Sequence, residues 1–148
     1  MLRTSLSTAQ KAWGCIDMAK LVVAFGGNAL GNTPEEQLER IEKAVVPIVD
    51  MIEQGNEIVL THGNGPQVGL IANAFSAAKR SGEIGCDMPF PECGAMSQGY
   101  IGYHIQNALQ CELEKRGIKK GVVSLVTQMV VDKTTQLFPI PPNMSVLL

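Results

Sequence analysis

The chain has 148 residues, of which 45% are hydrophobic and 18% charged, with a formal net charge of −2. This size and composition are typical of about one globular domain with a buried core. Lys and Arg form no cluster that would bind nucleic acid or an anionic membrane, and no apolar run approaches the ~18 residues of a membrane span. We therefore expect a cytoplasmic protein whose partner is a small molecule, with no nucleic-acid and no membrane partner.

The cysteines and histidines show no pattern of a metal or redox site. The chain has four cysteines: Cys15, Cys86, Cys93 and Cys111. None of their spacings is the C-x-x-C of zinc or redox sites, and no signal peptide indicates an oxidising compartment, so we expect reduced thiols. His62 and His104 belong to no cluster of ligands at metal-binding spacing, and we expect no metal site built by the protein alone.

The first 17 residues differ in composition from the rest of the chain. They include Arg3 and Lys11 and no acidic residue before Asp17, a composition that resembles an organelle presequence. A buried-strand pattern begins directly after Met18, where a compact domain would start. We expect residues 1–17 to be a leader or upstream sequence outside the fold.

Residues 20–25 form a short apolar run that ends in Gly26-Gly27-Asn28. This pattern predicts a buried strand followed by a tight turn.

A helix is predicted to follow this turn. Thr33 suits the N-cap, Pro34 the first helical position, and Glu36 completes a capping box. Apolar residues then recur at steps of three and four and predict one apolar face: Leu38, Ile41, Val45, Ile48 and Ile52. Gly55 suits the C-terminal cap. Pro47 is the exception, because it removes an internal hydrogen bond and predicts a kink about one turn before it.

The strand-turn-helix unit is then repeated. Residues 57–61 predict a second strand, and Gly63-Asn64-Gly65 is a second glycine-rich turn. Pro66 marks a helix start, and this helix is expected to run to Arg80. Residues 81–93 contain several Gly and Pro residues without a periodic pattern, which predicts a surface loop.

The last predicted elements are a helix over residues 95–116, closed by Gly117, and a strand over residues 121–131. Strands that alternate with helices indicate a mostly parallel sheet covered by helices. The sequence therefore predicts the α/β class, with a three-layer αβα arrangement around an open, parallel-rich sheet.

Both glycine-rich turns are predicted to lie where open parallel sheets bind ligands, at the carboxyl ends of the strands. Glycines let backbone N–H groups approach an anion, and the helix that follows adds partial positive charge. One such turn alone is explained by chain reversal, but two at one edge favour an oxyanion or phosphoryl site. The candidate binding residues are Gly26, Gly27, Asn28, Gly63, Asn64 and Gly65. Neither turn matches a P-loop or a dinucleotide fingerprint.

One polar stretch lies inside the third predicted helix. Residues 97–100 are Ser-Gln-Gly-Tyr, which is polar for a helix interior. This stretch either faces the ligand cleft or, through Gly99 and Gly102, serves helix packing.

Four segments together resemble the carbamate kinase family: VVAFGGNAL (22–30), THGNGPQVG (61–69), MP…CGAMSQGYIGYHIQNAL (88–109) and VTQMVVD (126–132). The resemblance covers residues 18–133. Related members of the amino-acid kinase superfamily that act on acetylglutamate, aspartate or uridylate typically carry a lysine just before the first glycine pair. This chain has Ala24-Phe25 there, which favours carbamate kinase.

The resemblance implies an amino-acid kinase fold and phosphoryl transfer between carbamate and ATP, with carbamoyl phosphate and ADP forming ATP in the reverse direction during arginine fermentation. It implies ATP/ADP with Mg²⁺ as cofactors and a cytoplasmic homodimer. The six candidate residues of the two glycine-rich turns would then hold carbamate or the phosphoryl group of carbamoyl phosphate. The catalytic residues stay unassigned, because the family's lysines, one in an Asn-Pro-Thr-Lys segment and one in the C-terminal half, have no counterpart here.

Residues 134–148 match no part of the family pattern. With synonymous codons chosen freely, the same stretch read in a shifted frame can contain the missing Asn-Pro-Thr-Lys. We therefore expect residues 18–133 to be the N-terminal, substrate-side part of a truncated carbamate kinase, with an out-of-frame tail, a nucleotide site absent from this chain, and no activity of its own. The alternatives are a non-catalytic remnant that binds an anion or forms a dimer, and a small complete enzyme with another substrate.

Overall fold

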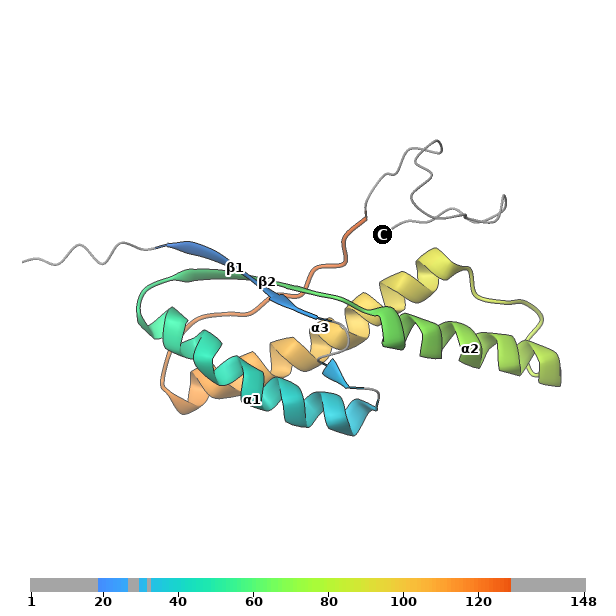
Figure 1. The fold of residues 1–148 in the computed structure, drawn as a ribbon, viewed down its shortest axis with the longest axis horizontal. Coiled ribbons are helices and arrows are strands. Elements are labelled where there is room, and N and C mark those ends of the chain that lie inside the picture. Colours follow the sequence, from blue (N-terminus) through green and yellow to red (C-terminus); the bar gives the residue numbers. More distant parts are fainter. Residues whose placement is uncertain (1–18, 27–29, 32, 129–148) are drawn as a thin grey trace, which may run out of the picture.

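A computed structural model describes residues 19–26, 30–31 and 33–128 of the chain (Figure 1). Within these residues the elements are β1 (Lys20–Phe25), α1 (Pro34–Glu53), β2 (Glu57–His62), α2 (Gly65–Ser81) and α3 (Phe90–Lys115). The predicted leader and the predicted non-family tail lie outside the described residues. No helix in the described part is long and apolar enough to cross a membrane.

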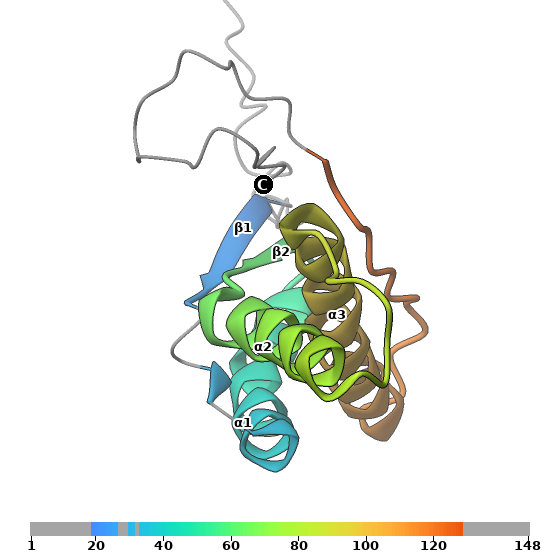
Figure 2. The ribbon, with the colours of Figure 1, turned by 90° about the vertical axis from the view of Figure 1, so that its right-hand side faces the viewer.

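The two strands form a parallel pair in which residues 20–25 lie opposite residues 57–62. Val23 and Ile58 are among the alternate side chains that pack toward the core, on the face where α1 and α3 lie (Figures 1 and 2). On the opposite face Val22 is 70% exposed and Val59 57% exposed. The predicted α/β class with a parallel sheet is confirmed. The helices α1 and α3 cover one face of this sheet.

The start of α1 follows the predicted capping chemistry. Thr33 is the N-cap, and its hydroxyl accepts a hydrogen bond from the N–H of Glu36 at 3.2 Å. The buried face differs in part from the prediction, because Leu38 is exposed and Val49 is fully buried instead. The helix continues through Pro47, which lies on the exposed side.

The core lies between α1, α3 and the inner face of the sheet. The fully or almost fully buried apolar side chains include Ile41, Val45, Ile48, Ile101, Leu109 and Leu113. Burial of each such side chain stabilises the fold by about 1.5–3 kcal/mol. The helix α3 begins at Phe90, so the prediction that the loop extends to residue 93 is wrong at its end. Pro91 is compatible with this start, because a first-turn residue needs no N–H.

The C-terminal ends of α1 and α3 are joined by Arg116. Its guanidinium donates to Asp50 Oδ1 at 2.5 Å and to Glu53 Oε2 at 2.9 Å on α1, and to Glu112 Oε1 at 2.8 Å on α3. The hydrogen bond from Arg116 lowers the pKa of the Glu112 carboxyl. One cation thus fixes the relative position of the two helices that support the sheet.

The strand predicted over residues 121–131 is not formed in its described part, residues 121–128. This segment lies along α3, where the N–H of Ser124 bonds Gln106 Oε1 and the N–H of Thr127 bonds Gln98 Oε1. A groove of about 580 Å³ separates the segment from β2. A strand needs a neighbouring backbone at ~4.8 Å, and among the described residues this apolar segment has no partner strand.

Candidate functional site

Gly26 and the second glycine-rich turn lie at the same edge of the sheet, because β1 and β2 run parallel. The backbone N–H of Gly63 donates to the carbonyl oxygen of Phe25 at 2.9 Å and holds the second turn against the end of β1. Gly26 directly follows that strand, whereas Gly27 and Asn28 lie outside the described residues. The structure therefore brings Gly26 and the second turn to one place.

The second turn leads directly into α2. Asn64 is the N-cap residue, and Gly65, Pro66 and Gln67 form the first turn. The first hydrogen bond of the helix runs from the N–H of Val68 to the carbonyl oxygen of Asn64 at 2.8 Å. The N–H groups of Gly65 and Gln67 precede this bond and have no partner inside the helix, and Pro66 has no N–H. These two donors point out of the N-terminus of α2.

Open space lies beside Gly26 and Gly65. A Cβ added at Gly26 or at Gly65 would meet no neighbouring atom within 4 Å. The aligned peptide dipoles of α2 place about half a positive charge at its N-terminus. Space, N–H donors without a partner inside the helix, and positive potential together favour an oxyanion.

The side chain of Asn64 is held from the middle of α3. Asn64 Nδ2 donates to Ser97 Oγ at 2.7 Å, and Ser97 Oγ donates to the carbonyl oxygen of Gly94 at 2.7 Å. Ser97 is fully buried. The polar run from Ser97 to Tyr100 was the sequence signal for this contact, although the sequence did not indicate which residue Ser97 would bind.

A second polar residue, Gln67, joins α2 to the segment after the first turn. Its Nε2 donates to the carbonyl oxygen of Gly31 at 3.1 Å, and its side chain is buried. Its Oε1 is buried without a hydrogen-bond partner in the part of the chain that the structure describes. Sequence reasoning missed Gln67, because no local pattern distinguishes it from any other polar residue in a helical first turn.

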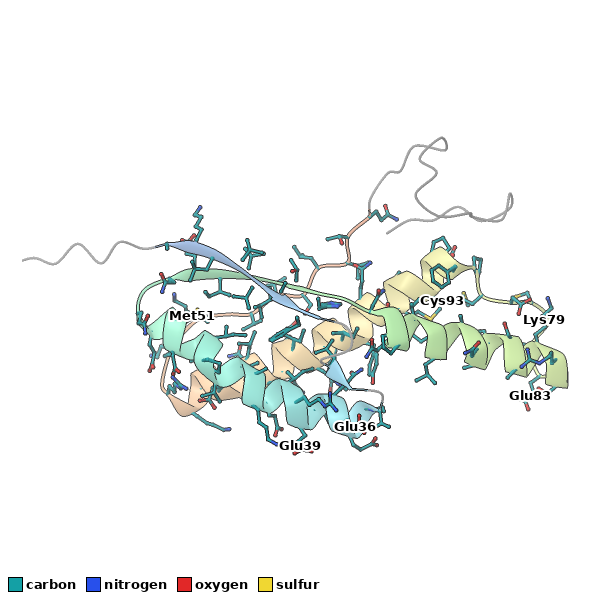
Figure 3. The ribbon with its side chains drawn as sticks, viewed as in Figure 1. Glu36, Glu39, Met51, Lys79, Glu83 and Cys93 are labelled. Atoms are coloured by element: carbon teal, nitrogen blue, oxygen red, sulfur yellow. The ribbon has the colours of Figure 1, made fainter. Side chains whose placement is uncertain are left out.

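The lysine of α2 lies away from the turns. Figure 3 shows Lys79 and Glu83 at the end of α2 opposite Asn64. Lys79 Nζ contacts Asp87 Oδ2 at 2.5 Å and closes the loop before α3. This ion pair raises the pKa of the Lys79 ammonium and lowers the pKa of the Asp87 carboxyl. Lys79 is therefore committed to the loop and does not provide a cation for the turns.

The two histidines have different surroundings. His62 Nδ1 lies 3.2 Å from the carbonyl oxygen of Gly63, and it must donate because a carbonyl only accepts. His104 is buried in α3 with its ring 4.9 Å from that of Tyr100, and burial lowers the pKa of the His104 imidazole. Burial raises the pKa of the Tyr100 phenol. His104 is therefore neutral at pH 7.

No group of three His, Cys, Asp or Glu side chains that could hold a metal occurs among the described residues. Cys86, Cys93 and Cys111 are free thiols, and burial raises the pKa of the Cys93 thiol. What the described residues offer at the site is hydrogen-bond donors and a helix dipole. Such an arrangement can bind and orient an anion.

Comparison with known proteins matches the chain to one family. The model of the amino acid kinase family matches residues 19–138. A carbamate kinase of Staphylococcus epidermidis is 52% identical over 124 residues, which is 84% of this chain and 40% of that protein. A carbamate kinase of Staphylococcus haemolyticus has the same identity and coverage. The chain thus spans about 40% of the length of the curated relatives it matches.

Solved structures show the same relationship. The carbamate kinase of Giardia lamblia bound to AMP-PNP aligns with a TM-score of 0.72 and 35% identity, over 80% of this chain and 42% of that one. A crystal structure from Aeropyrum pernix K1 aligns with a TM-score of 0.70 and 33% identity, over 78% of this chain and 37% of that one. Because the family model covers most of the chain and the fold agrees, this protein belongs to the amino acid kinase family.

Proposed function

We propose that this chain forms the substrate-side anion site of a carbamate kinase, an enzyme that transfers a phosphoryl group between carbamoyl phosphate and ADP. The observation that supports the proposal is that Gly26, at the end of β1, and the turn after β2 lie at one edge of the sheet, next to the N-terminus of α2. The 52% identity to carbamate kinases selects the substrate. Gly26, Gly27 and Asn28 of the first turn and Gly63, Asn64 and Gly65 of the second would surround carbamate or the transferred phosphoryl group.

The donors of the second turn are not equivalent. The N–H of Gly63 is committed to the carbonyl oxygen of Phe25, so Gly63 shapes the turn. The N–H groups of Gly65 and Gln67 are then the groups of this turn that would contact substrate oxygens, whereas the side chain of Asn64 is held by Ser97. Phosphoryl transfer depends mainly on positioning and on stabilising charge on the equatorial oxygens, which preorganised N–H groups provide.

The nucleotide and its Mg²⁺ would be held elsewhere in the whole protein. ATP supplies the phosphoryl group, and Mg²⁺ offsets the charge of its phosphates. The described residues provide no set of carboxylates for the metal. We propose that the parts present in the longer relatives bind the nucleotide, supply the cations that complete the active site, and complete a homodimer.

The anion site is tested by titrating the ¹⁵N-labelled chain with inorganic phosphate and with carbamoyl phosphate. Saturable amide shifts are expected at Gly26, Gly65 and Gln67, and sodium chloride at equal ionic strength is the control. Gly65→Ala should weaken phosphate binding, because its methyl group enters the space beside the turn. Gly69→Ala, one turn further along α2 and equally open, should not. If no residue at the turns shifts, or both variants behave alike, the anion site is absent.

Activity is tested by ATP formation from ADP and carbamoyl phosphate. The 148-residue chain is expected to form no ATP, because it spans 40% of its relatives. A chimera that joins residues 18–128 to the remaining sequence of the Staphylococcus epidermidis relative is expected to form ATP. A chimera that folds and binds phosphate without forming ATP would reject catalysis in favour of a non-catalytic anion-binding module.

A further inference from the structure

The N-cap residues of α1 and α2 behave differently. Thr33 has φ −116° and ψ 157°, and its side chain caps α1. Asn64 has φ −142° and ψ 11°, and its side chain makes no capping hydrogen bond to α2. Asparagine is among the strongest N-cap residues, so the absence of this bond needs a cause.

The position of Pro66 limits what Asn64 could cap. An N-cap side chain accepts from the N–H of the second or third helical residue. The second residue of α2 is Pro66, which has no N–H, so the N–H of Gln67 is the single capping target. That same N–H is one of the donors that the anion site requires.

Ser97 accounts for the conformation of Asn64. Its hydroxyl proton is donated to the carbonyl oxygen of Gly94, so its oxygen must accept the hydrogen bond from Asn64 Nδ2. The direction of this hydrogen bond orients the side-chain amide of Asn64 with Nδ2 toward α3. Ser97 is fully buried, so its side chain is held in place by the packing of α3.

We propose that Ser97 is a positioning residue of the anion site: it holds the Asn64 side chain against α3 and thereby leaves the N–H of Gln67 open to a substrate oxyanion. Without the Ser97 hydroxyl, Asn64 can rotate to the extended backbone conformation seen at Thr33. Its Oδ1 would then accept from the N–H of Gln67 and compete with the anion. The identity of the anion rests on the proposed function, whereas the release of Asn64 does not.

The first experiment uses the whole chain without any anion. Ser97→Ala should slow hydrogen exchange at the amide of Gln67 by about five-fold, the effect of gaining a typical N-cap. It should also move the Asn64 side-chain amide resonances. Ser97→Thr, which restores the hydroxyl, should leave both unchanged. If Ser97→Ala does not fold, Ser97→Cys provides nearly the same volume with a weak acceptor and should act in the same direction. Unchanged exchange at Gln67 in the Ala or Cys variant would overturn the proposal.

The second experiment measures binding of inorganic phosphate in a double-mutant cycle. Ser97→Ala should weaken binding about five-fold where Asn64 is present, because Asn64 then occupies the donor. In the background of Asn64→Gly, which has no side chain to cap with, Ser97→Ala should have no effect. Equal weakening in both backgrounds would show a purely structural role for Ser97. If the unsubstituted chain binds no phosphate, the proposed function fails, and the exchange experiment still decides the role of Ser97.

Discussion

Two glycines of α3 provide a matched test of how the 121–128 segment packs. Gly99 is exposed, and a Cβ added there would meet no atom within 4 Å. Gly102 is buried, and a Cβ added there would lie 3.1 Å from both Cβ and Oγ of Ser124. The same substitution to alanine in one helix therefore separates helix propensity from packing against Ser124.

The expected magnitudes follow from these contacts. Gly99→Ala should stabilise the fold by about 0.5–1 kcal/mol, because alanine loses less backbone entropy in a helix. Gly102→Ala gains the same propensity but must displace Ser124, and overpacking of this kind costs about 1–3 kcal/mol. The displacement also stretches the bond from Ser124 Oγ to the carbonyl oxygen of Gly102, now 2.9 Å. Gly102→Ala should therefore be less stable than Gly99→Ala by about 1–3 kcal/mol.

The assay is equilibrium unfolding in urea, with the free energy of unfolding and the m-value compared among variants. Ser124→Gly in the Gly102→Ala background removes the atoms in contact and should recover most of the lost stability. Equal stabilisation by Gly99→Ala and Gly102→Ala would refute the reasoning, because it would mean that residue 124 does not lie against α3.

Two further changes test α1 and the buried histidine. Pro47→Ala should raise the free energy of unfolding by up to about 3 kcal/mol, measured in urea, because Pro47 is exposed inside α1 and alanine restores the missing hydrogen bond. A neutral or destabilising effect would show that α1 depends on the proline. Burial lowers the pKa of His104 below its ordinary 6.5, so below pH 6.5 the unfolded chain binds this proton more readily than the folded chain and stability should fall as the pH drops. Phenylalanine does not titrate in this range, so His104→Phe should reduce the dependence of the melting temperature on pH between pH 7 and 5. An unchanged dependence on pH would exclude His104 as its source.

The sequence predicted most of the elements because their signals are local. The limits of β1 agree with the prediction residue for residue, since an apolar run followed by glycines defines a buried strand and a turn within ten residues. The cap at Thr33 and the start of α2 near Pro66 follow from side-chain chemistry within one helical turn. That Gly26 and the second turn lie at one edge could also be predicted, because parallel strands place their carboxyl ends at one edge.

The tertiary structure decided the features that depend on residues distant in the sequence. Residues 121–128 are rich in Val and Leu like a strand, but strand formation requires a neighbouring backbone, and α3 supplies side-chain amides instead. Asn64 has the identity of an N-cap, but Ser97, 33 residues further along the chain, binds its side chain. Local pattern fixes which conformations a residue prefers. Only the packing of α3 against the second turn determines which hydrogen-bond partner Asn64 meets, and with it which donors stay open at the proposed anion site.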